Sequence, residues 1–257
     1  MASTWNPAQY EKFHDERSKP FFDLLALVEP CPGGRVIDLG CGTGELTAAL
    51  HQRSGAAETL GIDSSETMLA KSAGSASQGL HFKRSGILEF EAEQPFDVVF
   101  SNAALQWIDG HDSLFDHLNG LVAPGGQLAV QMPANNDHPS HLVAHAVARE
   151  EPFASAMGGY AREWPVRPPE WYAAKLDRLG FEGLNVRLQV YVHHLESREG
   201  VVEWVKGSLL TDYEKRMPPE LYQRFLERYR SALLPQLSET RPFFYPFKRI
   251  LIWGRRG

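Results

Sequence analysis

The order of apolar and polar positions along the chain predicts short buried strands that alternate with amphipathic helices. Continuous apolar runs, such as Val98-Val99-Phe100, predict buried strands, and the segments between them carry apolar residues at helical spacing. The predicted strands cover residues 35–39, 59–63, 80–83, 96–101, 127–131, 186–192 and 247–253. The predicted helices lie within the first 30 residues and at 45–53, 65–73, 111–122, 138–150, 168–179 and, without strands between them, 197–237. Such alternation predicts a doubly wound, mostly parallel sheet with right-handed crossovers.

The same pattern divides the chain into a core and a cap. We expect the seven-stranded α/β core to comprise residues 1–132, 180–195 and 245–257, with 1–30 as an N-terminal helical lid. Residues 133–179 and 196–244 are then a mostly helical insertion that caps one end of the sheet. The alternative is a peripheral pair of helices with no part in ligand binding.

Composition narrows the class of protein. The formal net charge of −6 disfavours a nucleic-acid partner, because phosphate binding needs an excess of Lys and Arg on one face. No apolar run reaches the ~18 residues of a membrane span, and the N-terminus does not resemble a secretory signal. The only cysteines, Cys31 and Cys41, form no disulfide framework, so we expect free thiols and a cytoplasmic location.

Candidate chemistry begins in the glycine-rich segment that follows the first strand. Gly40, Gly42 and Gly44 would let the backbone turn tightly and let a ligand lie against it without a Cβ clash. Ligands of open α/β sheets bind at this end, the carboxyl end of the strands. Asp63 ends the next strand, about 20 residues on, where a carboxylate can accept both ribose hydroxyls of an adenosine.

The spacing of the glycines distinguishes between two kinds of cofactor. The dinucleotide fingerprint G-x-G-x-x-G packs a pyrophosphate on the helix N-terminus, but here Glu45 occupies the position of its last glycine. A carboxylate at the helix start would repel a pyrophosphate and would tolerate a ligand with a sulfonium and an ammonium group. Asp38, two residues before the first glycine, favours the same kind of ligand.

These motifs resemble those of the class I S-adenosylmethionine-dependent methyltransferases. The resemblance covers roughly residues 35–132 and the closing strands, and rests on Val36 to Thr47, Gly61 to Ser65, Phe96 to Asn102 and Leu121 to Gly126. It implies a Rossmann-like methyltransferase fold that binds S-adenosylmethionine. It also implies that Asp38 and the glycines line the methionine part, that Asp63 holds the ribose and that Asn102 touches the cofactor.

One position departs from the family pattern. Where these methyltransferases usually carry an acidic residue for the adenine amino group, this chain has Gly86. We expect backbone groups and apolar contact with Ile87 and Met68 to hold the adenine instead. The full set of predicted cofactor residues is Asp38, Gly40, Cys41, Gly42, Gly44, Asp63, Ser64, Met68, Gly86, Ile87, Asn102 and Trp107.

More specific segments resemble a narrower family within this class, the methyltransferases that esterify trans-aconitate. These segments are 5–10, 16–20, 61–65 with 68–70, 102–107 and 128–133. The resemblance implies a monomethyl ester of a small tricarboxylate as one product and S-adenosylhomocysteine as the other.

The chemistry of a carboxylate acceptor sets what the protein has to supply. A carboxylate has a pKa near 4, so it is already a nucleophile at neutral pH, and we predict no catalytic acid or base. In-line placement and the loss of water are what it needs. Aromatic faces, for which Tyr10 and Trp107 are candidates, would favour a sulfonium by cation–π attraction; ordinary packing is the alternative for both.

Arginine suits a carboxylate best because its guanidinium can bind in a bidentate manner. Arg17 is the first candidate to hold the acceptor, with a solvated helix face as the alternative. Arg162, Arg167, Lys248 and Arg249 are weaker candidates. The predicted substrate-binding residues are Tyr10, Arg17, Gln131 and Arg241.

Other functions find less support. The histidine pairs at 138/141 and 193/194 lack an acidic partner at metal spacing, so we expect no metal. A nicotinamide-dependent oxidoreductase is disfavoured by Glu45. A methyltransferase for another small molecule and a cofactor binder without turnover stay open as alternatives.

Overall fold

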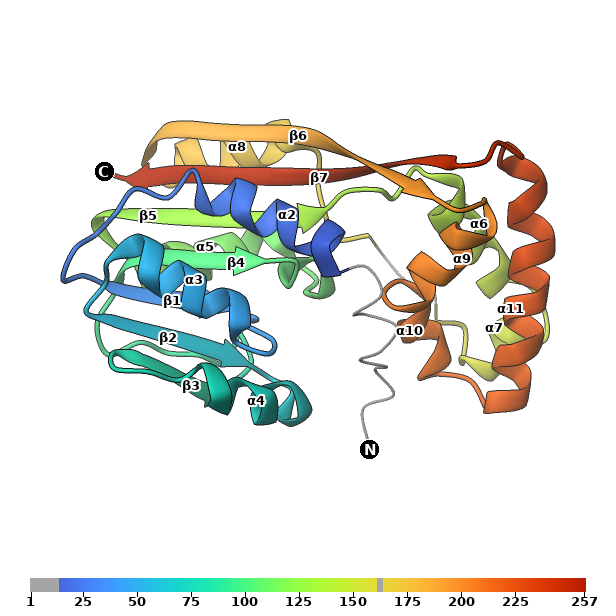
Figure 1. Ribbon diagram of the computed structural model, residues 1–257, viewed down its shortest axis with the longest axis horizontal. Coiled ribbons are helices and arrows are strands. Elements are labelled where there is room, and N and C mark those ends of the chain that lie inside the picture. The colour runs from blue at the N-terminus through green and yellow to red at the C-terminus, as the bar shows by residue number, and fades with distance from the viewer. Residues whose placement is uncertain (1–13, 161–163) are drawn as a thin grey trace. The chain divides into compact units, whose positions relative to one another are not determined.

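The computed structural model describes residues 14–160 and 164–257. Its centre is one seven-stranded sheet with the order β3-β2-β1-β4-β5-β7-β6 (Figure 1). Neighbouring strands from β3 to β5 are parallel, and β7 is antiparallel to β5. The strands are β1 Arg35–Leu39, β2 Glu58–Asp63, β3 Leu80–Arg84, β4 Phe96–Asn102, β5 Val122–Pro133, β6 Phe181–Leu195 and β7 Phe243–Arg256. The expected mostly parallel, seven-stranded α/β sheet is therefore confirmed.

The last two strands are about twice as long as the hydrophobic pattern predicted. β6 is the edge strand, and 11 of its 15 residues are partly or fully exposed, so its apolar positions are interrupted by polar ones. Leu188, Val190 and Val192 are about half exposed although they are apolar. An edge strand gains much of its stability from backbone pairing with its neighbour, which hydrophobicity does not record.

The chain forms two compact units, which are described separately. Of the described residues, the sheet unit comprises 17–134, 164–189 and 249–257, and the cap unit comprises 14–16, 135–160 and 190–248. The helices of the sheet unit are α2 His14–Leu25, which begins in the cap ranges, α3 Glu45–Ser54, α4 Glu66–Ser72, α5 His111–Leu121 and α8 Pro169–Arg178, with the short 3-10 helices η1 Ala73–Ser75 and η2 Leu105–Trp107.

Helices cover both faces of the sheet. On one face Phe21 of α2 packs against Phe100 of β4 with ring centroids 5.1 Å apart, and α3 lies beside α2 (Figure 1). On the other face, α5 and α8 bury the main apolar cluster. This cluster includes Ile37, Leu39, Val99, Leu128 and Val130 from the strands, and Leu114, Phe115, Leu118, Tyr172 and Leu176 from the helices.

Helix α8 belongs to the sheet unit, whereas the division at residue 179 had assigned it to the cap. The Tyr172 hydroxyl lies 2.5 Å from His111 Nδ1 on α5, and it accepts a hydrogen bond from the Arg167 backbone N–H. Lys175 pairs with Asp112 and Asp116 of α5 at 3.0 and 2.6 Å. The amphipathic pattern of α8 predicted a helix correctly but could not indicate which surface its apolar face would meet.

The cap unit has an aromatic core of its own. Its helices are α6 Pro139–Ala148, α7 Phe153–Ala156, α9 Glu199–Lys206, α10 Leu210–Glu214, α11 Pro219–Leu233 and the 3-10 helix η3 Leu234–Gln236. Phe225 of α11 packs against Phe153, Tyr213, Tyr222 and Tyr229, and all five rings are buried. Within the described ranges, no helix is both long and apolar enough to span a bilayer.

Candidate cofactor and acceptor site

The glycine turn after β1 leaves one position open to a ligand. Gly40, Gly42 and Gly44 have φ angles of 80°, 59° and 75°, a left-handed region that favours glycine. A Cβ on Gly40 would lie 2.3 Å from the Ala104 Cβ, and one on Gly44 would lie 2.6 Å from the Phe82 ring. A Cβ on Gly42 would meet nothing within 4 Å. Two of the glycines are thus required by packing, and Gly42 faces space that a ligand can occupy.

Asp63, at the end of β2, holds the turn in place. One of its carboxylate oxygens accepts the Gly42 N–H at 3.0 Å and the other accepts the Ser65 N–H at 2.8 Å. The Gly40 and Cys41 N–H groups donate to the Ile62 carbonyl, so the turn is fastened to β2 by backbone bonds as well. Each carboxylate oxygen has a second lone pair, which leaves Asp63 able to accept the two hydroxyls of a ribose.

Asp38 places a second carboxylate under the same turn. Its side chain is buried and accepts a 2.6 Å hydrogen bond from the Thr47 hydroxyl of α3. Burial, above all, and the nearby charge of Asp63 raise the pKa of Asp38 to about 7, against the hydrogen bond from Thr47, which lowers it. The Cys41 thiol has a raised pKa for the same reason, burial, so it is no thiolate. Such a site favours a cationic ligand, because a positive charge would stabilise the ionised form of Asp38.

Residues at and after the end of β4 form the other side of the candidate site. Ala103 has a φ of 54°, rare for a residue with a Cβ, and its N–H donates to the Gln131 carbonyl. Gln106 of η2 donates its amide to the Ala103 carbonyl at 2.7 Å. Within the described part of the chain, Asn102 Oδ1 and Gln106 Oε1 are buried and accept no hydrogen bond. Buried acceptors without donors are rare in folded proteins, so these two carbonyl oxygens fit the ammonium donor of an amino-acid ligand.

Gln106 was missed by the sequence analysis. Gln106 lies in segment 102–107, which resembles the family, but nothing in the sequence indicates that its side-chain amide is buried. Trp107, which had been selected, is about half exposed. Ser65 caps α4 by accepting the Met68 N–H at 3.3 Å.

The segment after β3 contains an acidic side chain, Glu89, next to Gly86, the position where the family usually has an acidic residue. Strand β3 lies beside β2, and the Ser85 N–H donates to the Asp63 carbonyl. A Cβ built on Gly86 would lie 1.8 Å from Glu89 Oε2. The Glu89 carboxylate therefore fills the space that a side chain at position 86 would have occupied. Ile87, half-buried, and the exposed Leu88 provide apolar surface beside it.

The predicted acceptor-binding residues lie in several places. Gln131 is fully buried near the end of β5, next to Arg249 of β7. Arg241 is exposed in the cap unit. Tyr10 lies outside the described residues. Arg17 belongs to α2, but its side chain is outside what the structure describes.

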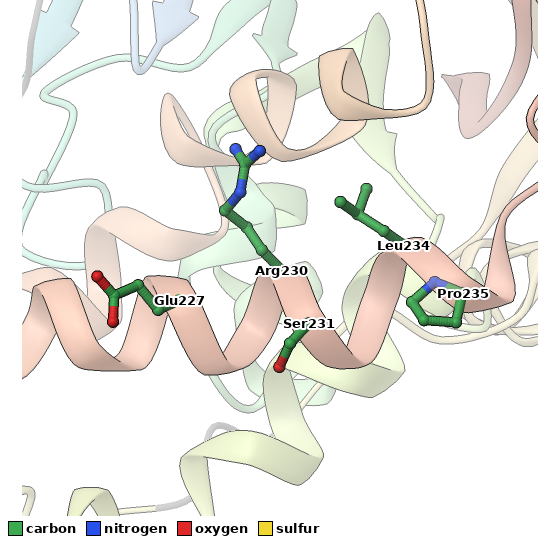
Figure 2. A pocket seen from close by; sticks show the side chains of 5 residues that line it. All are labelled: Glu227, Arg230, Ser231, Leu234 and Pro235. Atoms are coloured by element: carbon green, nitrogen blue, oxygen red, sulfur yellow. The ribbon is translucent and has the colours of Figure 1, made fainter.

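A pocket elsewhere in the cap unit has little chemistry to offer. Figure 2 shows its five lining side chains, which all come from the end of α11 and the turn after it. They are Glu227, Arg230, Ser231, Leu234 and Pro235. None of these was selected from the sequence. Among the described residues, no three His, Cys, Asp or Glu side chains gather in a way that could hold a metal ion.

Several solved structures share this fold. The chain superposes on the YcgJ protein of Bacillus subtilis with a TM-score of 0.61 at 12% identity, over 93% of this chain and 98% of that one. With the phosphoethanolamine N-methyltransferase 2 of Haemonchus contortus, in complex with S-adenosylhomocysteine, the TM-score is 0.55 at 17% identity, over 93% and 52% of the two chains. Identities this low show a shared fold and nothing finer.

Sequence relationships identify the class and then the family. A family model for the methyltransferase domain matches residues 31–164, so the chain belongs to the methyltransferases. The chain is 42% identical to the trans-aconitate 2-methyltransferase of Deinococcus radiodurans over 98% of each chain. It is 39% identical to that of Methylobacterium nodulans over 98% of each, and 37% identical to that of Escherichia coli O1:K1 / APEC over 99% of each. The chain belongs to the trans-aconitate 2-methyltransferase family, which confirms the resemblance found in the sequence.

Proposed function

We propose that this enzyme transfers the methyl group of S-adenosylmethionine to one carboxylate of trans-aconitate. The products are the monomethyl ester and S-adenosylhomocysteine. The substrate follows from the relatives' names, which hold over nearly the full length of both chains. The methyl donor is supported by one observation above all, the pair of carboxylates Asp38 and Asp63 around the open space at Gly42.

The donor would lie along the carboxyl ends of the first strands. Asp63 would accept the ribose hydroxyls, and the turn with Gly40, Cys41, Gly42 and Gly44 would carry the methionine part. Asn102 Oδ1 and Gln106 Oε1 would accept hydrogen bonds from its ammonium group.

Beyond the ribose, the base would meet the segment after β3. Glu89 would accept the adenine amino group, while Ile87 and Met68 would contact the ring. Ser64 and Trp107 are further proposed contacts, and about half of Trp107 is exposed.

The charge of this site argues against a pyrophosphate ligand. Asp38, Asp63 and Glu45 place three carboxyl groups around the glycine turn and the first turn of α3. A dinucleotide would bring two negative charges to this point, whereas S-adenosylmethionine brings a sulfonium and an ammonium. An oxidoreductase that uses NAD is therefore the weaker candidate.

The reaction asks little acid–base chemistry of the protein. S-adenosylmethionine supplies an electrophilic methyl: the carboxylate oxygen forms the new O–C bond as the S–C bond breaks, and sulfur keeps the electron pair. No proton moves, so the chain's own residues have to bind, orient and exclude water. Tyr10, Arg17 and Arg241 remain proposed acceptor contacts.

Transfer of a radiolabelled methyl group tests the proposal. Purified protein is incubated with labelled S-adenosylmethionine and, separately, trans-aconitate, cis-aconitate, citrate and isocitrate, and base-labile counts are scored. Labelling of trans-aconitate well above the other acids supports the proposed reaction. Cofactor binding with no labelled acid would contradict the substrate and direct the search to other small acceptors.

A further inference from the structure

A polar pair lies inside the sheet unit on the two strands beyond the proposed methyl-donor site. Gln131, near the end of β5, is fully buried, and Arg249 of β7 is only 5% exposed. In the β5–β7 register Gln131 faces Leu251, so Arg249, two residues earlier, points to the same face of the sheet. In the β4–β5 register Gln131 faces Asn102, which places it beside the ammonium end of the proposed donor site.

The Gln131 amide is oriented so that its donor end is available. Arg249 Nη1 lies 3.5 Å from Gln131 Oε1, which turns the amide nitrogen away from the guanidinium. Within the described residues, Gln131 Nε2 is buried and donates to no acceptor. A buried donor without an acceptor is energetically costly, and native structures seldom leave one unless a ligand or water supplies the acceptor. An acceptor group is therefore expected at this point.

Arg249 defines the charge of that acceptor. Its guanidinium is buried beside the unpartnered Gln131 Nε2, so the positive charge there favours an anionic acceptor, and its planar fork matches a carboxylate. A carboxylate placed here would receive hydrogen bonds from Arg249 and from Gln131 Nε2 at once. The pair offers donors only, apart from the Oε1 that already faces Arg249.

The order of the strands places such an anion where an acceptor molecule is needed. The proposed donor site uses the ends of β2, β1 and β4, and β5 and β7 follow next in the sheet (Figure 1). An anion bound by Gln131 and Arg249 would thus lie on the methionine side of the donor, away from its adenine.

We infer that Gln131 and Arg249 form a carboxylate anchor for the acceptor. The inference rests on the proposed function for the identity of that acceptor. The anchored carboxylate is one that does not react, because charge-assisted hydrogen bonds from Arg and Gln would withdraw electron density from an attacking oxygen. The anchor holds one end of the polyanion and leaves another carboxylate to face the methyl group.

The test is binding of trans-aconitate to the full-length protein loaded with S-adenosylhomocysteine, measured by calorimetry. Arg249→Met should weaken binding about 10- to 100-fold, and Gln131→Met about tenfold, as expected for charge-assisted hydrogen bonds. The affinity for S-adenosylhomocysteine should stay within twofold in both variants. Binding of trans-aconitate within twofold of the wild type in both variants would overturn the anchor.

Gln127→Met provides a matched control. Gln127 is a second buried glutamine on the same strand and face, but both ends of its amide have protein partners, namely Glu29 and Trp253. Gln127→Met should lower the melting temperature and leave trans-aconitate affinity within twofold. If it weakens binding as much as Gln131→Met does, the effect is structural and the anchor is refuted.

Three dicarboxylate analogues separate an anchor from a general loss of structure. Mesaconate, glutaconate and itaconate each lack a different one of the three carboxylates of trans-aconitate. The analogue that lacks the anchored group should bind equally well to the wild type and to Arg249→Met, because that variant has lost only the partner of the missing group. Loss of affinity for all three analogues in the variant would contradict the anchor. If Arg249→Met does not fold, Gln131→Met and Arg249→Lys carry the same comparison.

The binding test of the anchor and the labelling test of the proposed function can fail independently. Wild-type protein that binds trans-aconitate through the pair but transfers no label would refute the methylation and keep the anchor. Wild-type protein that methylates trans-aconitate, with unchanged binding in the variants, would keep the function and refute the anchor. Absence of binding to the loaded wild type would refute the anchor directly.

Discussion

At the scale of single residues, two aspartates under one glycine turn have different electrostatic environments. Asp63 accepts two backbone N–H groups at the rim of the site. Asp38 is buried, has one hydroxyl partner, and its pKa is raised to about 7. The unfolded chain would release this proton near pH 4, so the native state holds it longer. Between about pH 4 and pH 7 the ligand-free protein therefore loses stability as the pH rises.

The ionisation of Asp38 predicts a pH dependence of cofactor affinity. Because a cationic ligand favours the carboxylate form, affinity for S-adenosylmethionine should rise from pH 6 towards pH 8, with a midpoint at or below 7. Thr47→Val removes the hydrogen bond that lowers the pKa of Asp38, so its midpoint should lie higher than that of the wild type. Calorimetric titrations between pH 5.5 and 8.5 measure both. The ligand's own amino group titrates identically with either protein, so superimposable profiles would rule out the role of Asp38.

Substitution of Asp63 should reduce the affinity for S-adenosylmethionine by more than the ionisation of Asp38 changes it, and with less dependence on pH. Asp63→Ala removes two acceptors for ribose hydroxyls, worth roughly 1.5–3 kcal/mol each, so affinity for S-adenosylmethionine should fall at least 100-fold.

Asp97→Ala is the matched control for Asp63→Ala. Asp97 also accepts a backbone N–H, that of Arg35, at 2.7 Å, but at the opposite end of the strands. This control should lose stability and keep its cofactor affinity. An Asp63→Ala protein that binds as the wild type does would refute the ribose assignment.

At the scale of elements, the turn between β1 and α3 shows how backbone conformation and ligand space are combined. Gly40 and Gly44 are closely packed against Ala104 and Phe82, so they are needed for folding. Gly42 has the same left-handed backbone with open space beside it. A single turn thus contains glycines needed for packing and one glycine available to a ligand.

A pair of glycine substitutions separates these roles. Gly42 and Gly55 both have left-handed φ angles, 59° and 66°, and at neither would a Cβ meet an atom closer than 3.8 Å. Alanine at either position should cost about 1–2 kcal/mol of stability through backbone strain. Only Gly42→Ala should also reduce S-adenosylmethionine affinity, by tenfold or more, because its methyl group occupies ligand space. Equal cofactor affinities in the two variants, measured beside their melting temperatures, would show that Gly42 does not face the ligand.

At the scale of the whole molecule, the proposed donor site lies entirely within the sheet unit. Every cofactor residue named above falls in the range 17–134. The chain passes from one unit to the other several times, and β6 and β7 each contribute residues to both. The net charge of −6 makes a local cation such as Arg249 all the more necessary for a polyanionic acceptor.

Because the donor site lies within the sheet unit, bound S-adenosylmethionine should slow amide hydrogen exchange in that unit. At a concentration of S-adenosylmethionine about 100 times its Kd, binding stabilises the ligand-competent state by roughly 2.7 kcal/mol. Amide exchange in peptides covering 36–47 and 96–107 should slow by up to about 100-fold, whereas α11 should exchange as before. Hydrogen-exchange mass spectrometry with and without the ligand measures this. Strong protection of α11 with none at 36–47 would place the donor in the cap unit and refute the proposed site.

The sequence alone determined the class of fold, the glycine turn and the positions of most strands. These features are encoded locally: a run of apolar residues predicts a buried strand whatever its neighbours are, and β1 was predicted with its observed bounds, 35–39. Asp38 and Asp63 could be selected because the turn and the next strand fix where their side chains lie. Membership of the family was also readable from short segments, since these combine the same locally encoded elements.

Only the tertiary structure decided contacts between distant residues. Gln131 and Arg249 are 118 positions apart, and no periodicity relates them. Glu89 fills the space beside Gly86 because of how the loop after β3 folds back, and α8 joins the sheet unit because Tyr172 and Lys175 find partners on α5. Side-chain chemistry and hydrophobic period are properties of a residue and its neighbours in the chain, whereas burial and missing partners are properties of the packed molecule.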